Sequence, residues 1–172
     1  APEDAKRLLL VFEKREMPVM IVEKDRMYLN FVNDAVRRAQ ADISTPVPET
    51  GVYTGEEIYQ FILYDRGWEA DELVRTLTQS RMIRWHERAV DVIPEKGGKV
   101  AGIRRSLEDF SISQEEIMAF GDGENDMDML KFAGIGIAMG NADTQVKAIA
   151  DEVTESVDEN GVVRALYRHG LL

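Results

Sequence analysis

The sequence predicts an α/β protein of two units: an α+β unit on an antiparallel sheet over residues 1–92, and a parallel-sheet unit over residues 93–172. In the first unit, short apolar runs flank tight turns, which is typical of hairpins. In the second, strand-length apolar runs alternate with helical periodicity, which indicates a parallel sheet with helices on its faces. One of these runs ends in two glycines and a cluster of acids, at the sheet edge where ligands bind in open α/β sheets.

The elements expected in the first unit follow from apolar spacing and turn residues. Residues 1–17 read as an amphipathic helix, because Leu8, Leu9 and Phe12 fall on one face and acids stand in the first turn. The other expected elements are strands at 18–23 and 27–31 around a turn at 24–26, a helix at 33–41, a loop at 44–55, a strand at 58–64, a helix at 69–79 and a strand at 82–93.

The second unit is expected to open with a glycine-containing hinge loop at 94–98, because glycines absorb backbone changes at little steric cost. After it, strands and helices alternate. The expected order is a helix at 99–110, a strand at 117–121, a helix at 124–132, a strand at 134–139, a helix at 143–150, a strand at 152–154 and a helix at 161–168.

The composition excludes several classes of partner. The chain has 172 residues, 44% hydrophobic and 31% charged, with a net charge of −11 and no cysteine. A disulfide framework and thiol catalysis are therefore excluded. No basic stripe is present to neutralise phosphates, so neither nucleic acid nor an anionic membrane is an expected partner. No apolar run reaches membrane-spanning length, and a cytoplasmic enzyme is expected.

The acidic cluster after the strand at 117–121 suits a divalent cation. Asp122 and Asp126 are four residues apart, so both can face one site across the first helical turn, and hard oxygen ligands favour Mg²⁺. The amide of Asn125 can donate a hydrogen bond to a phosphate oxygen. Helix capping would explain one acid, but four acids, an Asn and two glycines are too many. An EF-hand loop is excluded, because Met127 and Ala133 stand where Gly and Glu are required.

These residues carry a resemblance. Residues 121–126, Gly-Asp-Gly-Glu-Asn-Asp, followed by residues 134–142, Gly-Ile-Gly-Ile-Ala-Met-Gly-Asn-Ala, resemble the last motif of the haloacid dehalogenase (HAD) superfamily, and more narrowly the Cof-type sugar-phosphate phosphatases. The resemblance implies a HAD-like parallel-sheet (Rossmannoid) core, here partial, in residues 93–172. It also implies that residues 1–92 are the α+β cap domain, which selects the leaving group.

The resemblance assigns roles to particular residues. It implies that Asp122 is a Mg²⁺ ligand, that Asp126 is either a second ligand or a group that orients one, and that Asn125 contacts the phosphoryl group. Lys99 would be the catalytic and phosphate-binding cation, because a site of several carboxylates and a phosphate needs a fixed positive charge. Lys96 is a rival for that role.

Four further residues have competing interpretations. In the cap, Arg84, Trp85 and His86 are candidate contacts to a sugar or carboxylate of the substrate, although Arg and His on a strand face are more often only solvated. Asn141 lies at the end of the next strand, near the acidic edge. Its favoured reading is a cap for the helix at 143–150.

One part of the family's pattern is not found in this sequence. The family opens with a strand ending in Asp-x-Asp, whose first Asp is the nucleophile, and the triplet at Asp126–Asp128 falls inside a helix instead. We therefore expect residues 1–172 to be the cap and the C-terminal part of the core, with an N-terminal core segment of about 80–90 residues as the missing partner, at roughly 30 residues per βα unit.

The expected function of the intact protein is Mg²⁺-dependent hydrolysis of small phosphorylated metabolites, sugar phosphates above all, through an aspartyl-phosphate intermediate. The chain alone is expected to be inactive. The alternative is a non-catalytic fragment, a binding or regulatory remnant of a HAD-like protein that lacks turnover because the nucleophile is absent.

Overall fold

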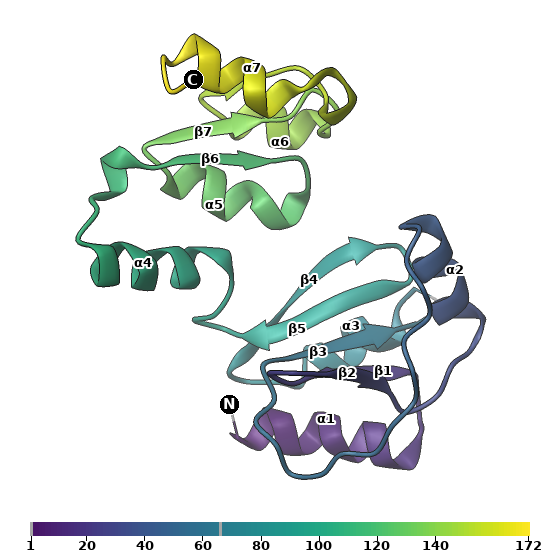
Figure 1. Ribbon diagram of the computed structural model, residues 1–172. Helices are drawn as coiled ribbons and strands as arrows, with labels where there is room; N and C mark the ends of the chain where they lie inside the picture. Colours follow the sequence, from purple (N-terminus) through teal and green to yellow (C-terminus); the bar gives the residue numbers. More distant parts are fainter. Residues whose placement is uncertain (1, 66) are drawn as a thin grey trace. The chain divides into compact units, whose positions relative to one another are not determined.

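Figure 1 shows the computed structural model of the protein, which describes residues 2–65 and 67–172. The chain divides into two compact units, Ala1–Lys96 (unit 1) and Gly97–Leu172 (unit 2). The division falls between Lys96 and Gly97, whereas the sequence placed it between residues 92 and 93. Each unit has its own sheet and its own hydrophobic core.

Unit 1 is built on a five-stranded antiparallel sheet with strand order β2-β1-β3-β5-β4. The strands are β1 (Val19–Val22), β2 (Met27–Leu29), β3 (Gln60–Tyr64), β4 (Ser80–His86) and β5 (Ala89–Pro94). Side chains alternate between the two faces: Phe61 and Leu63 join one buried cluster, and Tyr64 joins another on the opposite face.

Helices cover both faces of this sheet. On one face, α1 (Pro2–Lys14) and α3 (Glu69–Val74) place Leu8, Phe12 and Val74 in the larger apolar cluster. On the other, α2 (Asp34–Asp42) contributes Val36 and Ala39 to the smaller one. The sequence of each helix therefore needs only one apolar stripe, as the spacing predicted.

A buried carboxylate ties the first helix to the segment that opens β4, 74 to 76 residues further along the chain. Asp4 is 5% exposed and accepts hydrogen bonds from the amides of Thr78 (3.1 Å) and Gln79 (2.9 Å) and from the Ser80 hydroxyl (2.8 Å). Burial opposes its ionisation, but these donors outweigh burial and lower the pKa of Asp4 below its usual value. α1 is thus fixed to the start of β4.

The prediction of one strand over 82–93 was wrong. The segment forms two antiparallel strands, β4 and β5, with His86 opposite Ala89 across a turn at Glu87 and Arg88. The turn was missed because neither of these residues is one of the usual turn formers, Gly, Pro, Asn, Asp or Ser. Several boundaries also differ by a few residues; among them, Pro94 ends β5 rather than opening a loop, and α3 ends at Val74, short of the predicted residue 79.

Unit 2 is a three-stranded parallel sheet with strand order β6-β7-β8. The strands are β6 (Met118–Gly121), β7 (Ile135–Ala138) and β8 (Glu152–Val153); the helices are α4 (Lys99–Phe110), α5 (Met127–Phe132), α6 (Thr144–Ile149) and α7 (Gly161–Arg168). Three 3₁₀ turns, Gln114–Glu116, Glu124–Asp126 and Val157–Glu159, precede β6, α5 and α7. The predicted α/β class is confirmed.

Mostly small and branched side chains form the core of unit 2. Ala119, Leu130, Ala138 and Val146 lie in one buried cluster that joins the strands to α5 and α6. In contrast, α4 contributes no buried residue, and its Phe110 is 74% exposed. β6 pairs only with β7 in the part of the chain that the structure describes, so its other edge is open.

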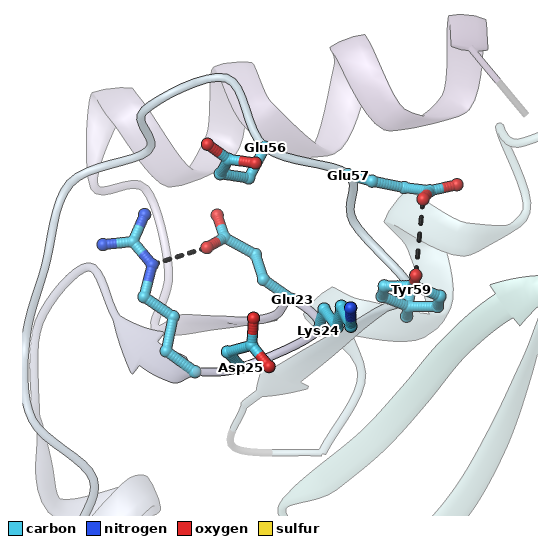
Figure 2. A pocket seen from close by; sticks show the side chains of 7 residues that line it. Glu23, Lys24, Asp25, Glu56, Glu57 and Tyr59 are labelled. Carbon is cyan, nitrogen blue, oxygen red and sulfur yellow. Dashed lines mark hydrogen bonds and ion pairs between the residues drawn. The ribbon is translucent and has the colours of Figure 1, made fainter.

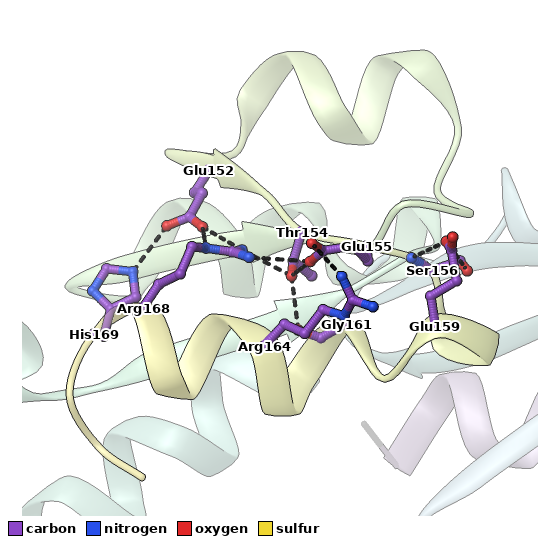
Figure 3. A network of polar contacts seen from close by, with 9 residues as sticks. All are labelled: Glu152, Thr154, Glu155, Ser156, Glu159, Gly161, Arg164, Arg168 and His169. Atoms are coloured by element: carbon purple, nitrogen blue, oxygen red, sulfur yellow. Dashed lines mark hydrogen bonds and ion pairs between the residues drawn. The ribbon is translucent and has the colours of Figure 1, made fainter.

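The C-terminal helix is held to β8 by a network of charged side chains (Figure 3). Arg168 on α7 donates to Glu152 (2.6 Å), to Glu155 (3.0 Å) and to the Thr154 hydroxyl (2.9 Å). These contacts, with Arg168 as the largest cause, lower the pKa of Glu155 to about 2. Within residues 2–65 and 67–172, no helix combines the length and the apolar character needed to cross a membrane.

Candidate active site

The candidate site begins where β6 ends, at Gly121 and Asp122. A Cβ at Gly121 would lie 2.4 Å from the Cβ of Asp126, so only glycine allows the Asp126 side chain to fold back against the strand end. The chain then makes a 3₁₀ turn and enters α5. This is the strand, glycine turn and helix that the sequence predicted, at the carboxyl edge of a parallel sheet.

Asp126 is the buried centre of this turn. It is 6% exposed, and its Oδ2 accepts hydrogen bonds from the backbone N–H of Asp122 (3.1 Å) and Gly123 (3.2 Å). Its Oδ1 accepts from the ammonium of Lys99, the first residue of α4. Burial opposes ionisation, yet Lys99 and the two amides outweigh it and lower the pKa of Asp126. Both oxygens of Asp126 are therefore engaged within the protein.

Asp122 is in a different state. Its side chain is exposed, and its Oδ2 accepts a hydrogen bond from Nδ2 of Asn141 (2.8 Å). That donor is a neutral amide, so it orients the carboxylate without cancelling its charge. In the described part of the chain, no residue donates to Oδ1 of Asp122, which leaves this oxygen open to a cation.

The residues present fit an incomplete Mg²⁺ shell. Among the described residues, no group of three or more His, Cys, Asp or Glu side chains is close enough to hold a metal ion. Mg²⁺ in phosphoryl-transfer sites commonly takes only one or two carboxylates and fills the shell with waters and substrate phosphate. Asp122 fits one such ligand, while the contacts of Asp126 favour the orienting role over direct ligation.

Two asparagines, Asn125 and Asn141, are the other residues that the sequence placed near this site. Asn125 is half-buried and makes no hydrogen bond through its side chain to another described residue, so its amide remains available for an oxygen ligand. Asn141 was predicted to cap the helix α6, and this prediction is wrong, because the N-cap of that helix is Asp143. The reach of Asn141 across to Asp122 depends on how two loops meet, which local sequence does not encode.

Arg84, Trp85 and His86 have partners inside unit 1. Arg84 donates to Asp71 (3.1 Å) and to the Glu87 carbonyl (3.1 Å), and it lies 3.7 Å from Oδ1 of Asp65, whose side chain is fully buried. The guanidinium is therefore neither simply solvated nor free for a substrate carboxylate. Asp65 also accepts from the amide of Ala70 (2.9 Å), which fixes the start of α3.

The neighbouring aromatic residues are held in the same way. The indole N–H of Trp85 donates to Asp91 (2.8 Å), and its ring packs edge-to-face against Tyr64. Nε2 of His86 lies 3.1 Å from Asp42, while its Nδ1 accepts the amide of Arg88. A substrate-binding role for these three residues stays a prediction.

A cavity in unit 1 lies instead beside the β1–β2 turn (Figure 2), lined by residues 23–26 with Glu56, Glu57 and Tyr59. Glu23 lies within it, paired with Arg26 (2.5 Å) and with the Tyr28 hydroxyl (2.7 Å). Tyr59 donates to Glu57 (3.3 Å) at the other side. The sequence predicts only a turn at these charged residues, because nothing local indicates that residues 56–59 return to it.

Comparisons with known proteins agree with the fold and identify the family. The sequence profile of the haloacid dehalogenase-like hydrolases matches residues 1–166. The chain is 36% identical to the putative phosphatase YkrA of Bacillus subtilis, over 99% of this chain and 68% of that protein. The crystal structure of the HAD subclass IIB sugar phosphatase BT4131 superposes with a TM-score of 0.84 at 31% identity, covering all of this chain and 68% of BT4131.

The chain combines two features of one class of protein: a parallel sheet with an acidic glycine turn at its carboxyl edge, and a separate α+β unit on an antiparallel sheet. The chain belongs to the haloacid dehalogenase-like hydrolases. Within them, its relatives support the narrower recognition of a Cof-type phosphatase, which is confirmed. A further structure, described for a trigonal-bipyramidal intermediate in a phosphoryl-transfer superfamily, superposes with a TM-score of 0.87 at 30% identity and covers all of this chain and 67% of its own.

Proposed function

We propose that unit 2 supplies the cation-binding half of the active site of a Mg²⁺-dependent phosphomonoester hydrolase that acts on small phosphorylated metabolites, sugar phosphates in particular. The observation that carries the proposal is that two neighbouring carboxylates have different kinds of hydrogen-bond donor. Asp126 is neutralised by Lys99, whereas Asp122 receives only a neutral donor and keeps an open oxygen. An acid that is oriented by a neutral amide and whose charge is not neutralised is not needed to stabilise the turn, and it suits a cation.

Lys99 is the group that meets the phosphate. One N–H of its ammonium is used by Asp126, which holds the side chain in place, and 48% of the side chain is exposed. A lysine carries three donors, so two remain for the phosphoryl oxygens and the attacking carboxylate. Fixed donors of this kind stabilise the charge of the transition state without reorganising.

Asp122 and Asn125 complete the assignment. Asp122 would hold Mg²⁺, which, when bound, neutralises charge on the phosphoryl oxygens and orients the phosphate. Asn125 would donate its amide to one of those oxygens. Asp126 acts through Lys99 and through the backbone of the turn, as an orienting residue.

The nucleophile we propose is an Asp on a core segment outside residues 1–172. Its oxygen attacks phosphorus, the ester P–O bond breaks, and the leaving alkoxide takes a proton from the second Asp of the Asp-x-Asp triplet, which later takes a proton from the attacking water. Water then attacks the phosphorus of the aspartyl phosphate, which releases inorganic phosphate and restores the carboxylate. Little covalent chemistry falls to unit 2, which positions and neutralises charge.

The open surface of unit 2 suits such a segment. The free edge of β6 offers backbone groups for another strand. Beside it lies an apolar groove lined by Ile103, Leu107 and Phe110 of α4 together with Ile117 and Met129. The relatives YkrA and BT4131 each carry about a third of their length beyond the match. We propose that a strand and helix of the core segment occupy the edge and the groove, and that unit 1 is the cap.

The test uses the whole enzyme and the variant Asp122→Asn, which keeps the shape of the side chain and removes its charge. We expect phosphate release to fall about 100-fold or more at low Mg²⁺ and to recover in part as Mg²⁺ is raised, because loss of a group that only orients a metal ligand already costs about 10- to 100-fold in metal affinity.

Glu124→Gln is the matched control. Glu124 belongs to the same acidic turn, is exposed and pairs with Gln145. It should retain the wild-type rate and Mg²⁺ dependence. Wild-type turnover by Asp122→Asn at low Mg²⁺ would remove Asp122 from the metal site and, with it, the basis of the proposal.

A further inference from the structure

The loop that carries Asn141 is hydrogen-bonded on one side to the end of β6 and on the other to the segment after β8. Just beyond β7, the amide of Met139 donates to the carbonyl of Gly121 (2.9 Å), and the amide of Gly140 donates to that of Glu155 (3.0 Å). A Cβ at Gly140 would lie 2.6 Å from the amide nitrogen of Ser156, so only glycine allows this approach. The backbone of Asn141 is therefore placed by both flanking segments.

The side chain of Asn141, like the backbone before it, contacts both neighbouring segments of the chain. Its Oδ1 accepts the amide of Val157 (3.1 Å), and its Nδ2 donates to Oδ2 of Asp122 (2.8 Å). A backbone N–H can only donate, so Val157 fixes which end of the amide is the oxygen. The NH₂ end is thereby held toward Asp122, with no alternative orientation that satisfies both contacts.

The chemical character of this donor matters. A lysine or arginine in the place of Asn141 would cancel the charge of Asp122, as Lys99 does for Asp126. An amide fixes the carboxylate rotamer and leaves the negative charge in place for a cation at the other oxygen. Asp122 itself is exposed, so without this contact its side chain would sample several rotamers.

We propose that Asn141 is a positioning residue that pre-orients the Asp122 carboxylate for Mg²⁺ and so sets the affinity of the metal site. The proposal rests on the proposed function, in that it takes Asp122 as a metal ligand. It adds a residue outside the acidic turn and links the metal site to the Ser156–Val157 segment that follows β8.

The experiment compares Asn141→Ala and Asn141→Asp in the whole enzyme. Asn141→Ala should raise the half-saturating Mg²⁺ concentration about tenfold, the lower end for loss of an orienting partner, while kcat at saturating Mg²⁺ changes little. Asn141→Asp has the same shape but no donor, and it puts a carboxylate against Asp122. It should lose metal affinity at least as strongly; wild-type or tighter affinity would show that donation from residue 141 is not what positions Asp122.

Gln145→Ala is the matched control. Gln145 also donates a neutral amide to the acidic turn, but to Glu124. Its loss should leave the Mg²⁺ dependence unchanged. If Gln145→Ala raises the half-saturating Mg²⁺ as much as Asn141→Ala, loosening of the turn as a whole explains the effect, and the specific role of Asn141 is refuted.

Binding without turnover separates this inference from the proposed function. Mn²⁺, followed by electron paramagnetic resonance in the absence of substrate, reports the metal site directly, and thermal unfolding of each variant reports folding. Weaker Mn²⁺ binding in Asp122→Asn but not in Asn141→Ala overturns the role of Asn141 alone. Unchanged binding in Asp122→Asn overturns the metal assignment on which both depend. We expect both variants to bind Mn²⁺ more weakly, with unfolding temperatures close to that of the wild type.

Discussion

The ammonium of Lys99 donates to the carboxylate of Asp126, although 27 residues separate them in the chain. The contact joins the first residue of α4 to the turn before α5, so two helix starts converge on one charge pair. Lys99→Ala removes the cation that we place at the phosphate group, which all substrates have in common. Turnover of every phosphate ester in a panel should fall about 100- to 1,000-fold, the usual cost of one transition-state donor.

Lys96→Ala is the control for Lys99. Lys96 is three residues away, exposed, and was the rival for the same role. It should leave kcat unchanged on the same panel. A loss in Lys96→Ala with normal turnover in Lys99→Ala would exchange the two assignments, and a loss confined to some esters would place Lys99 in substrate selection.

Residues 1–172 alone should release no phosphate from any monoester above background. The reason is chemical: of the two acids of the candidate site, Asp126 is neutralised by Lys99 and Asp122 is suited to a cation, so neither is presented as a nucleophile. The measurement is phosphate release by the purified chain with and without a chelator. Turnover that the chelator abolishes would show that these acids carry the chemistry themselves.

Arg84→Ala should destabilise unit 1 more than it alters substrate choice. It leaves the fully buried Asp65 side chain without its nearby positive charge, and Oδ1 of Asp65 already lacks a hydrogen-bond partner. Breaking a buried pair by removing one member costs about 3 kcal/mol in the free energy of unfolding. Urea denaturation measures this, with the exposed Arg75→Ala as control, expected within about 0.5 kcal/mol.

The cause can be separated from general disruption. Adding Asp65→Asn to Arg84→Ala removes the stranded charge and should restore part of the lost stability. If the double variant is no more stable than Arg84→Ala, the buried charge of Asp65 is not what Arg84 compensates.

The contacts of Arg168 should make the stability of unit 2 depend on pH. The pKa of Glu155 is lowered to about 2, and that of Glu152 is lowered by His169 and Arg168. A lowered pKa in the folded state stabilises it above the unfolded pKa, near 4.5, and this stabilisation is lost as pH falls toward 2. The unfolding temperatures of the wild type and Arg168→Ala should therefore differ at pH 6 and converge as pH falls below 4.5.

Arg105→Ala is the control for this comparison. Arg105 makes exposed pairs with Glu108 and Asp109 on α4, which contribute little. Its unfolding temperature should follow the wild type throughout. A gap for Arg168→Ala that stays constant down to pH 2.5 would mean that packing of the arginine, rather than its charge, holds α7.

The sequence predicted most elements because their signals are local. The Leu8–Phe12 stripe, the turn at 24–26 and the alternation after Lys99 each lie within one window of chain. It failed at Glu87 and Arg88, where the turn between β4 and β5 is imposed by strand pairing. The meeting of Asp122 and Asp126 at the carboxyl edge of the sheet was likewise predicted, because they follow a strand of a parallel sheet, whereas Lys99 was assigned to the same site by the family resemblance.

What the sequence could not supply was the partner of each polar side chain. Arg84 finds Asp65 and Asp71 only because β4 lies beside α3, and Asn141 finds Asp122 only because two loops meet beyond β6 and β7. Such pairs depend on tertiary geometry, so no periodicity of residues along the sequence predicts them. The cytoplasmic location and the cap role of unit 1 stay predictions.

The contacts of Asp4 impose an order on how the chain can fold as it is synthesised. Its three donors lie 74 to 76 residues further on, so unit 1 cannot close until β4 has left the ribosome. The strands of unit 2 are neighbours in the order in which they are made, and each can pair as it appears. Contacts of low sequence separation form fast and distant ones slowly. Unit 1 should therefore have the longer wait between the synthesis of its first helix and its closure, and during that wait its apolar surfaces are exposed to chaperones and proteases.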